Sequence, residues 1–143
     1  EPAPERVRGV STVELANRFE IGMPDGWVGG TADGAILFAE PGGEVVVRVF
    51  LAPGDRGPVA LAREARGFVA SERPSAAIGP TARTTVRGAP AAGFVARDGG
   101  EAERALLLSE GGYEYLLLAR VAPGASKRSR VLTAAALQRF KAL

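Results

Sequence analysis

The sequence predicts a single domain of the α+β class. Short strands in hairpins come first, then a helix, then a second group of strands, and finally a second helix. Strands and helices that alternated one by one would predict a parallel sheet, so this grouping favours an antiparallel one. The 143 residues suffice for one ordinary core, and 46% hydrophobic with 24% charged residues is typical of a globular protein.

Residues 1–11 are interpreted as a linker or tether, and residues 12–143 as the domain. Prolines and mixed charges near the start are typical of a segment that joins a domain to something upstream, such as a lipid anchor or a membrane helix. No apolar run approaches the roughly 20 residues that span a bilayer. We therefore expect membrane contact only through an N-terminal tether.

The next part of the chain predicts short strands. Residues 18–23 alternate polar and apolar side chains, which is typical of a half-buried strand, and residues 24–26 (Pro-Asp-Gly) form a turn. Trp27 follows the turn and is expected in the core. Residues 35–39 and 44–51 predict a hairpin, because the segment between them is rich in proline and glycine.

A first helix is predicted over residues 55–72. Pro58 lies near its start, where a missing N–H is tolerated, and Pro74 ends it. One stripe at helical spacing is apolar until its last position, and this stripe is expected to face the sheet. It consists of Val59, Ala62, Ala65, Phe68, Val69 and Glu72.

Four further strands are predicted over residues 82–86, 91–97, 101–108 and 113–121. The last two contain Leu-Leu-Leu runs, so both of their faces are apolar. A half-exposed antiparallel strand would alternate instead. We therefore expect these two strands at the centre of the sheet, with helices covering both of its faces.

The final helix is predicted from Lys127 to Leu143, with Ser126 as its N-cap. Its apolar stripe is expected to dock on the sheet. The stripe consists of Val131, Leu132, Ala135, Ala136, Phe140 and Leu143.

The composition argues against catalysis. The chain contains neither cysteine nor histidine, so it lacks thiolate nucleophiles, thiolate metal sites, the commonest general base and the commonest transition-metal ligand. No serine lies in a Gly-x-Ser-x-Gly turn, and no phosphate-binding glycine loop occurs. We expect no enzyme activity, no cofactor, and no catalytic, cofactor-binding or metal-binding residue.

Four glutamates are the remaining candidates for a catalytic or metal-binding role. Glu101 and Glu103 share one face of a strand, and Glu110 and Glu114 lie near one hairpin tip. Paired carboxylates serve acid–base catalysis or calcium binding. The favoured interpretation is that these charges keep the strand ends soluble. Clustering of all four around one cleft would favour an enzyme instead.

Two groups of residues form a candidate partner surface. Lys127, Arg128 and Arg130 give the strongest local charge, and Tyr113 and Tyr115 share one face of a strand. The alternatives are a solvated helix face and a tyrosine pair packed under a covering helix. Nucleic acid is not expected, because the net charge is only +2 and no aromatic residue lies in the basic run.

Several segments resemble the PsbP-like, or Mog-type, fold family. Residues 19–27 (FEIGMPDGW) are similar to its opening apolar strand, followed by a proline and a Gly-Trp turn. Residues 35–38 match a following strand, and residues 86–91 (VRGAPA) are similar to its Gly-x-Pro-Ala strand entry. A long hairpin then leads to a closing helix that ends near Phe140.

This resemblance implies an α/β/α sandwich whose central antiparallel sheet has about six to seven strands flanked by helices. Bacterial members of the family are mainly exported domains or lipoproteins, such as the LpqN and DcrB types. Other members are an extrinsic photosystem subunit and a nuclear transport factor that binds the Ran GTPase. They share no catalytic site, so the resemblance carries over no active residue.

The leading functional hypothesis is a non-catalytic binding or scaffolding module of the bacterial cell envelope, with a protein partner and an N-terminal tether. The second is a carrier of a small apolar ligand or lipid, with a pocket between sheet and helix lined by side chains such as Trp27 and Phe50. This carrier requires a cavity of about 300 Å³ or more. The third is an enzyme that uses only carboxylates and arginines.

Overall fold

The computed structural model describes residues 10–15, 19–32 and 34–142. Most of the predicted linker, residues 1–11, lies outside the described residues, and the description begins with the first strand at Val10. Among the described residues, no helix is long and apolar enough to span a membrane.

Strands and helices follow one another in the predicted grouping. The first five strands are β1 (Val10–Leu15), β2 (Phe19–Pro24), β3 (Val28–Ala32), β4 (Ala35–Ala39) and β5 (Val45–Pro53). Helix α1 (Pro58–Glu72) precedes β6 (Ala77–Ile78), β7 (Ala82–Val86), β8 (Ala89–Asp98), β9 (Glu101–Glu110) and β10 (Tyr113–Val121). Helix α2 (Lys127–Gln138) and β11 (Lys141–Ala142) come last. The sequence did not predict β1, β3, β6 and β11.

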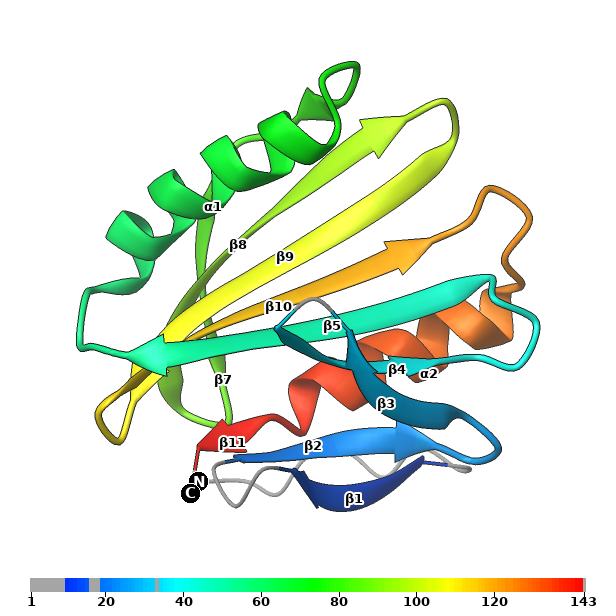
Figure 1. Ribbon diagram of the computed structural model, residues 1–143, viewed down its shortest axis with the longest axis horizontal. Coiled ribbons are helices and arrows are strands. Elements are labelled where there is room, and N and C mark those ends of the chain that lie inside the picture. Colours follow the sequence, from blue (N-terminus) through cyan, green and yellow to red (C-terminus); the bar gives the residue numbers. More distant parts are fainter. Residues whose placement is uncertain (1–9, 16–18, 33, 143) are drawn as a thin grey trace.

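Eight strands form one antiparallel sheet in the order β3-β4-β5-β10-β9-β8-β6, and β7 pairs with β8 beside β6. The two Leu-Leu-Leu strands, β9 and β10, are neighbours near its middle, so their predicted central position is confirmed. A smaller sheet, β1-β2-β11, lies apart from the large one (Figure 1).

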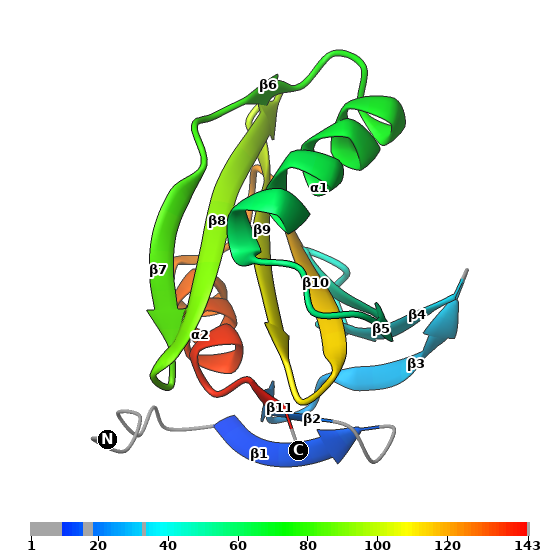
Figure 2. The same cartoon turned by 90° about the vertical axis from the view of Figure 1, so that its left-hand side faces the viewer.

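The large sheet separates two hydrophobic cores, and helices cover both of its faces (Figure 2). Helix α1 lies on one face, above Leu107 of β9 and Leu118 of β10. Helix α2 and the small sheet cover the other face, above Leu108 and Leu117. The predicted α+β sandwich with a central antiparallel sheet is therefore confirmed, with eight strands where about six to seven were expected.

Three aromatic rings join the small sheet to the large one. Tyr115 of β10 meets Phe140 at 4.9 Å and Phe19 of β2 at 5.8 Å between ring centroids, and Phe19 stacks on Phe140 at 5.4 Å. Each such pair contributes about 0.5–1.5 kcal/mol beyond its buried area. Tyr115 is 2% exposed, and both phenylalanines are fully buried.

Helix α1 begins at Pro58, three residues after the predicted start, because Gly57 at its N-cap still has extended backbone. The helix buries Leu61, which lay outside the predicted stripe, together with Ala62, Ala65 and Val69. Phe68 is 38% exposed, so it lies at the edge of the buried face. The predicted stripe was therefore rotated slightly away from the sheet.

Helix α2 begins as predicted, since the Ser126 hydroxyl accepts a hydrogen bond from the Ser129 N–H. It ends at Gln138, however, and not at the predicted residue 143. The following residues, Lys141–Ala142, form β11 and pair with Glu20 and Phe19 of β2. Phe140 is buried as predicted, but from the turn between α2 and β11.

Gly22 of β2 lets helix α2 approach the small sheet closely. A Cβ atom added at Gly22 would lie 2.8 Å from the Ala136 Cα of α2 and 2.9 Å from a methyl group of Val10. Real Cβ atoms essentially never come so close to a backbone atom. The packing of α2 on β2 therefore requires glycine at this position.

We expect Gly22→Ala to lower the free energy of unfolding by about 1–3 kcal/mol, because the added methyl group forces α2 away from β2. Urea unfolding followed by circular dichroism measures this change. Gly30→Ala is the matched control, since a Cβ atom at Gly30 of β3 meets nothing within 4 Å. Equal stability of the two variants would contradict the packing argument.

Candidate functional site

Helix α1 covers only part of its face of the large sheet. It packs mainly on β8 and β9, and the neighbouring surface of β10 and β5 extends beyond it (Figure 1). Arg48 and Phe50 of β5 and Leu116 of β10 lie on this uncovered surface and are partly buried. We call the surface between α1 and β5 the α1 groove.

One end of the α1 groove is an apolar hollow of about 350 Å³. The rings of Phe50 on β5 and Phe68 on α1 meet across it in a T-shaped contact, with 5.6 Å between centroids. Leu61 and Ala65 of α1 and Leu107 of β9 complete its apolar lining. The hollow therefore offers apolar surface to a side chain or a small ligand.

An ion-pair cluster borders the apolar hollow. Arg56 donates from Nε and Nη2 to the two carboxylate oxygens of Glu114, each at 2.9 Å, and its backbone N–H donates to the same carboxylate at 2.9 Å. Its Nη1 donates to Glu64 on α1. Because Ser109 Oγ also donates to the Arg56 carbonyl at 2.7 Å, the loop before α1 is fixed to the β9–β10 hairpin.

The other end of the groove is polar, with a hollow of about 530 Å³. Arg48 donates to both oxygens of Glu72, at 3.0 and 2.9 Å, and to Glu103 Oε2 at 3.2 Å. Arg73 pairs with Glu101 and approaches Glu103 Oε1 with its Nε at 3.6 Å. Two arginines and three glutamates therefore connect α1 and the segment after it to β5 and β9.

Glu103 is the centre of this cluster, and its side chain is 1% exposed. Its Oε2 accepts from Arg48, whereas Oε1 has no hydrogen-bond partner among the described residues. Two nearby guanidinium groups offset the cost of burying its charge. Arg48 also lies 5.6 Å from the ring centroid of Phe50, which links the polar and apolar ends of the groove.

The ion pairs shift the pKa values of their members. The hydrogen bonds that Arg48 donates to Glu72 lower the pKa of Glu72 below its ordinary value and raise the pKa of Arg48. The bonds that Arg56 donates to Glu114 likewise lower the pKa of Glu114 and raise the pKa of Arg56. These carboxylates are therefore kept ionised.

The four glutamates do not gather around one cleft, which is the arrangement that the enzyme alternative required. Glu101 and Glu103 belong to the polar end of the groove, whereas Glu114 borders the apolar hollow. The interpretation of Glu103 as a solvated surface charge was wrong, because α1 and the segment after it bring Arg48 and Arg73 over it. No group of carboxylates in the described part of the chain is arranged to hold a metal ion.

The candidate partner residues lie in two separate places. Tyr115 is buried against Phe19 and Phe140, so its ring offers no surface to a partner, whereas Tyr113 is partly exposed. Lys127, Arg128 and Arg130 are exposed on the first turn of α2, as predicted for a solvated face. Tyr113 and Tyr115 lie at the start of β10, whereas α2 begins just beyond the far end of this strand at Val121, so the structure does not bring the basic run and the tyrosines together.

Sequence reasoning missed the arginines that build the groove. A signal was present, because Arg48 interrupts the otherwise apolar run Val45 to Leu51. A charged residue inside a buried strand needs a partner of opposite charge. No comparable pattern singles out Arg56 or Arg73, because both lie outside the strands and helices.

Trp27 was predicted to line a ligand pocket, and it lies elsewhere. Its ring packs against Phe38 of β4, with 6.0 Å between centroids, beside the core that faces α2. Phe50, the other predicted lining residue, does line the apolar hollow. The hollow also exceeds the volume that the carrier hypothesis required.

No protein-family model matches the chain, and no curated protein matches its sequence. Solved structures do share its fold. Cyanobacterial PsbP from Synechocystis matches with a TM-score of 0.72 at 10% identity, over 100% of this chain and 98% of that one. The Saccharomyces cerevisiae Ran-binding protein Mog1p matches at 0.54 and 13% identity, over 92% of this chain and 94% of that one.

LpqN, a Mycobacterium tuberculosis protein involved in cell envelope biogenesis, matches with a TM-score of 0.53 at 16% identity, over 93% of this chain and 90% of that one. These three structures span nearly the whole chain, so the chain has the PsbP/Mog-type fold. At such low identities the matches establish the fold alone.

We expect Glu103→Ala to lower the free energy of unfolding by about 3 kcal/mol, because it leaves Arg48 and Arg73 without their buried partner. Glu101→Ala is the matched control. Its side chain is 27% exposed and pairs only with Arg73, so we expect a loss of about 1 kcal/mol or less. Urea unfolding of both variants checks this difference, and a larger loss for the control would refute it.

A pH prediction follows from Glu72 and Glu114. Their pKa values are lower in the folded chain than in the unfolded one, so the unfolded chain binds more protons as the pH falls. The stability that these two carboxylates confer is complete above their ordinary pKa and is lost as the pH falls through their pKa values in the folded chain. Between about pH 5 and pH 2, we expect the melting temperature of the wild type to fall more steeply than that of Glu72→Gln/Glu114→Gln. The same dependence of melting temperature on pH in both proteins would contradict this prediction.

Proposed function

We propose that this chain is a non-catalytic protein-binding module and that its partner docks in the α1 groove. The observation that carries this proposal is the surface of β5 and β10 beside α1, which α1 covers only in part. It joins an apolar hollow to a polar cluster whose groups are fixed by ion pairs. Preorganised polar groups around an apolar centre are typical of protein interfaces.

The charge beside the apolar hollow indicates the chemistry of the partner. One arginine, Arg56, is shared there between two carboxylates, Glu64 and Glu114, so the cluster carries a net negative charge. A partner that inserts an apolar side chain and places a basic side chain next to it complements both features. We therefore propose a partner segment with adjacent aromatic or aliphatic and basic residues.

The absence of enzyme activity is part of this proposal. The whole sequence lacks histidine and cysteine, and the glutamates of the groove are engaged by arginines. A carboxylate with a lowered pKa, such as Glu72 or Glu114, is a poor proton donor at neutral pH. This favours a structural role for these groups over acid–base catalysis.

We also propose that the domain, residues 12–143, acts in the bacterial cell envelope, as an exported or lipid-anchored protein tethered through residues 1–11. The support is the composition of that segment and the shared fold with LpqN, which is described as involved in cell envelope biogenesis. The shared fold with a Ran-binding protein supports a protein partner. The exposed basic run at Lys127, Arg128 and Arg130 remains a second candidate surface, separate from the groove.

Affinity purification from native envelope extract, read by mass spectrometry, tests the proposed function. We expect the wild-type domain to recover one protein at near-stoichiometric yield and Phe68→Ser to lose it, because Phe68 lines the apolar hollow. Val131→Ser is the matched control, since Val131 is a 47% exposed apolar residue on α2. If Phe68→Ser still recovers the partner protein and Val131→Ser does not, the partner binds outside the α1 groove.

The apolar hollow favours a second candidate function, the carriage of a small apolar ligand. Its volume of about 350 Å³ lies within the range of ligand pockets. Native mass spectrometry of the domain purified from its own host distinguishes the two functions. A bound small molecule that Phe68→Ser releases would support the carrier, and a ligand-free domain that still recovers its protein partner would exclude it.

A further inference from the structure

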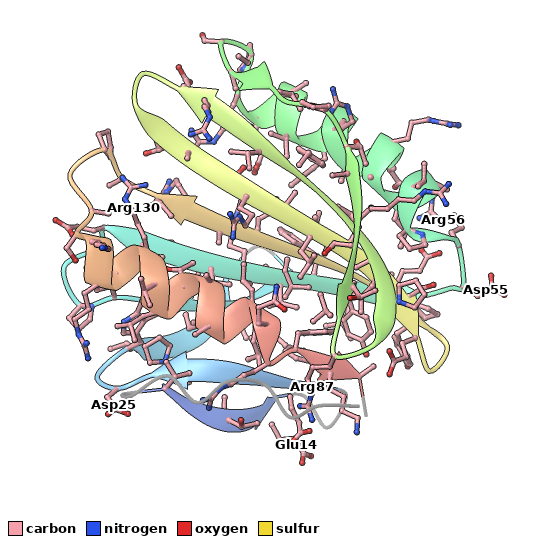
Figure 3. All side chains as sticks on the ribbon, turned by 180° about the vertical axis from the view of Figure 1, so that it is seen from behind. Glu14, Asp25, Asp55, Arg56, Arg87 and Arg130 are labelled. Carbon is pink, nitrogen blue, oxygen red and sulfur yellow. The ribbon has the colours of Figure 1, made fainter. Side chains whose placement is uncertain are left out.

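A second hollow lies on the opposite face of the large sheet. Its volume is about 430 Å³, and it is bounded by β7, β8 and β9 and by helix α2. Figure 3 views the molecule from this side, with α2 and β7 in front and the strands of the sheet between them. The hollow shares no lining residue with the polar end of the α1 groove.

Part of the wall of this hollow is apolar. Val95 of β8 and Leu106 of β9 line its floor, and Ala134 and Leu137 of α2 line the opposite side. Gly93 of β8 contributes no side chain to the floor. Such a surface accepts a short hydrocarbon chain.

Two arginines, Arg97 of β8 and Arg104 of β9, also line the hollow, and both are exposed. In the strand register Val95 faces Arg104 and Arg97 faces Ala102, so the two arginines are diagonal neighbours on one face of the sheet. Side chains in this relation lie within reach of one another, and like charges there repel. The pair therefore attracts an anion.

The carboxylates of the same strands point to the other face. Asp98 and Glu103 line the polar end of the α1 groove. None of the residues that line the second hollow is acidic. In the described part of the chain, neither Arg97 nor Arg104 forms an ion pair, whereas Arg48, Arg56 and Arg73 all do. Of these five arginines, the three paired ones lie on the side of α1, and Arg97 and Arg104 lie on the side of α2.

Helix α2 adds a further cation next to the hollow. Arg130 precedes Ala134 by four residues, and Ala134 precedes Gln138 by four, so the three share one side of the helix. Ala134 and Gln138 line the hollow. The Nε of Arg130 donates to the Ala125 carbonyl at 3.4 Å, and no acidic partner of its guanidinium group occurs among the described residues.

We propose that this hollow binds an anionic amphiphile, in which a phosphate or carboxylate group is attached to an alkyl chain. The anionic group pairs with Arg97 and Arg104, whose planar guanidinium groups match phosphate and carboxylate oxygens. The chain lies on Val95, Leu106 and the α2 side chains. This site is independent of the α1 groove and of the protein partner proposed for it.

Isothermal titration calorimetry with octyl phosphate tests the proposal on the purified domain. We expect one binding site, with affinity at least about tenfold higher than for octyl glucoside, which has the same chain without charge, or for inorganic phosphate. Arg97→Gln/Arg104→Gln should weaken octyl phosphate binding by about tenfold or more, because charge-assisted hydrogen bonds are lost. Ala134→Phe should weaken it by filling the hollow without changing charge.

Arg63→Gln/Arg83→Gln is the matched control, because it removes the same charge from exposed arginines that do not line the hollow. We expect it to bind octyl phosphate as the wild type does. Equal binding by this control and by Arg97→Gln/Arg104→Gln would overturn the proposal. So would equal affinity for octyl glucoside and octyl phosphate.

Sedimentation with vesicles identifies the source of the amphiphile. Phosphatidylcholine vesicles with and without phosphatidylglycerol provide the comparison. Co-sedimentation that needs phosphatidylglycerol, Arg97 and Arg104 would identify a membrane lipid headgroup. Binding of octyl phosphate without co-sedimentation would identify a free amphiphile. Binding of neither probe would overturn the site.

Discussion

The burial of β9 and β10 on both faces is the constraint on which the rest of the structure depends. Leu106, Leu107 and Leu108 alternate between the two cores, and so do their neighbours on β10. Because no single layer can cover both faces, the chain places α1 on one face and α2 with a small sheet on the other. The positions of both helices and of the small sheet follow from this requirement.

The layers that cover the two faces of the large sheet differ in extent, and this difference produces the α1 groove. The small sheet and α2 together enclose the larger core, whereas α1 packs alone on the other face. The open surface of β5 contains Phe50 and Arg48, and the charge of Arg48 would be costly to bury without a partner. Ion pairs with Glu72 and Glu103 hold Arg48 in place and so make the open surface rigid.

Two patterns in the sequence predicted β2, β4, β5 and the four later strands: the alternation of polar and apolar residues, and runs of apolar residues. Both patterns depend only on local geometry. The pairing of Glu103 with Arg48 and Arg73 could not be predicted, since it depends on how α1 crosses the sheet. The early end of α2 was missed for a similar reason: Lys141–Ala142 leave the helix to pair with β2, a partner far away in sequence.

The pairing of β11 with β2 also bears on how the chain is made. Glu20 and Phe19 find their partners in Lys141 and Ala142, near the opposite end of the sequence. A nascent chain emerges from the ribosome with its N-terminus first, so β2 emerges long before these partners. The pairing of β2 with β11 therefore cannot form before residues 141–142 have left the ribosome. Until then the face of β2 that holds Phe19 and Ile21 lacks the cover of Phe140, and during this interval it is open to chaperones or to a second nascent chain.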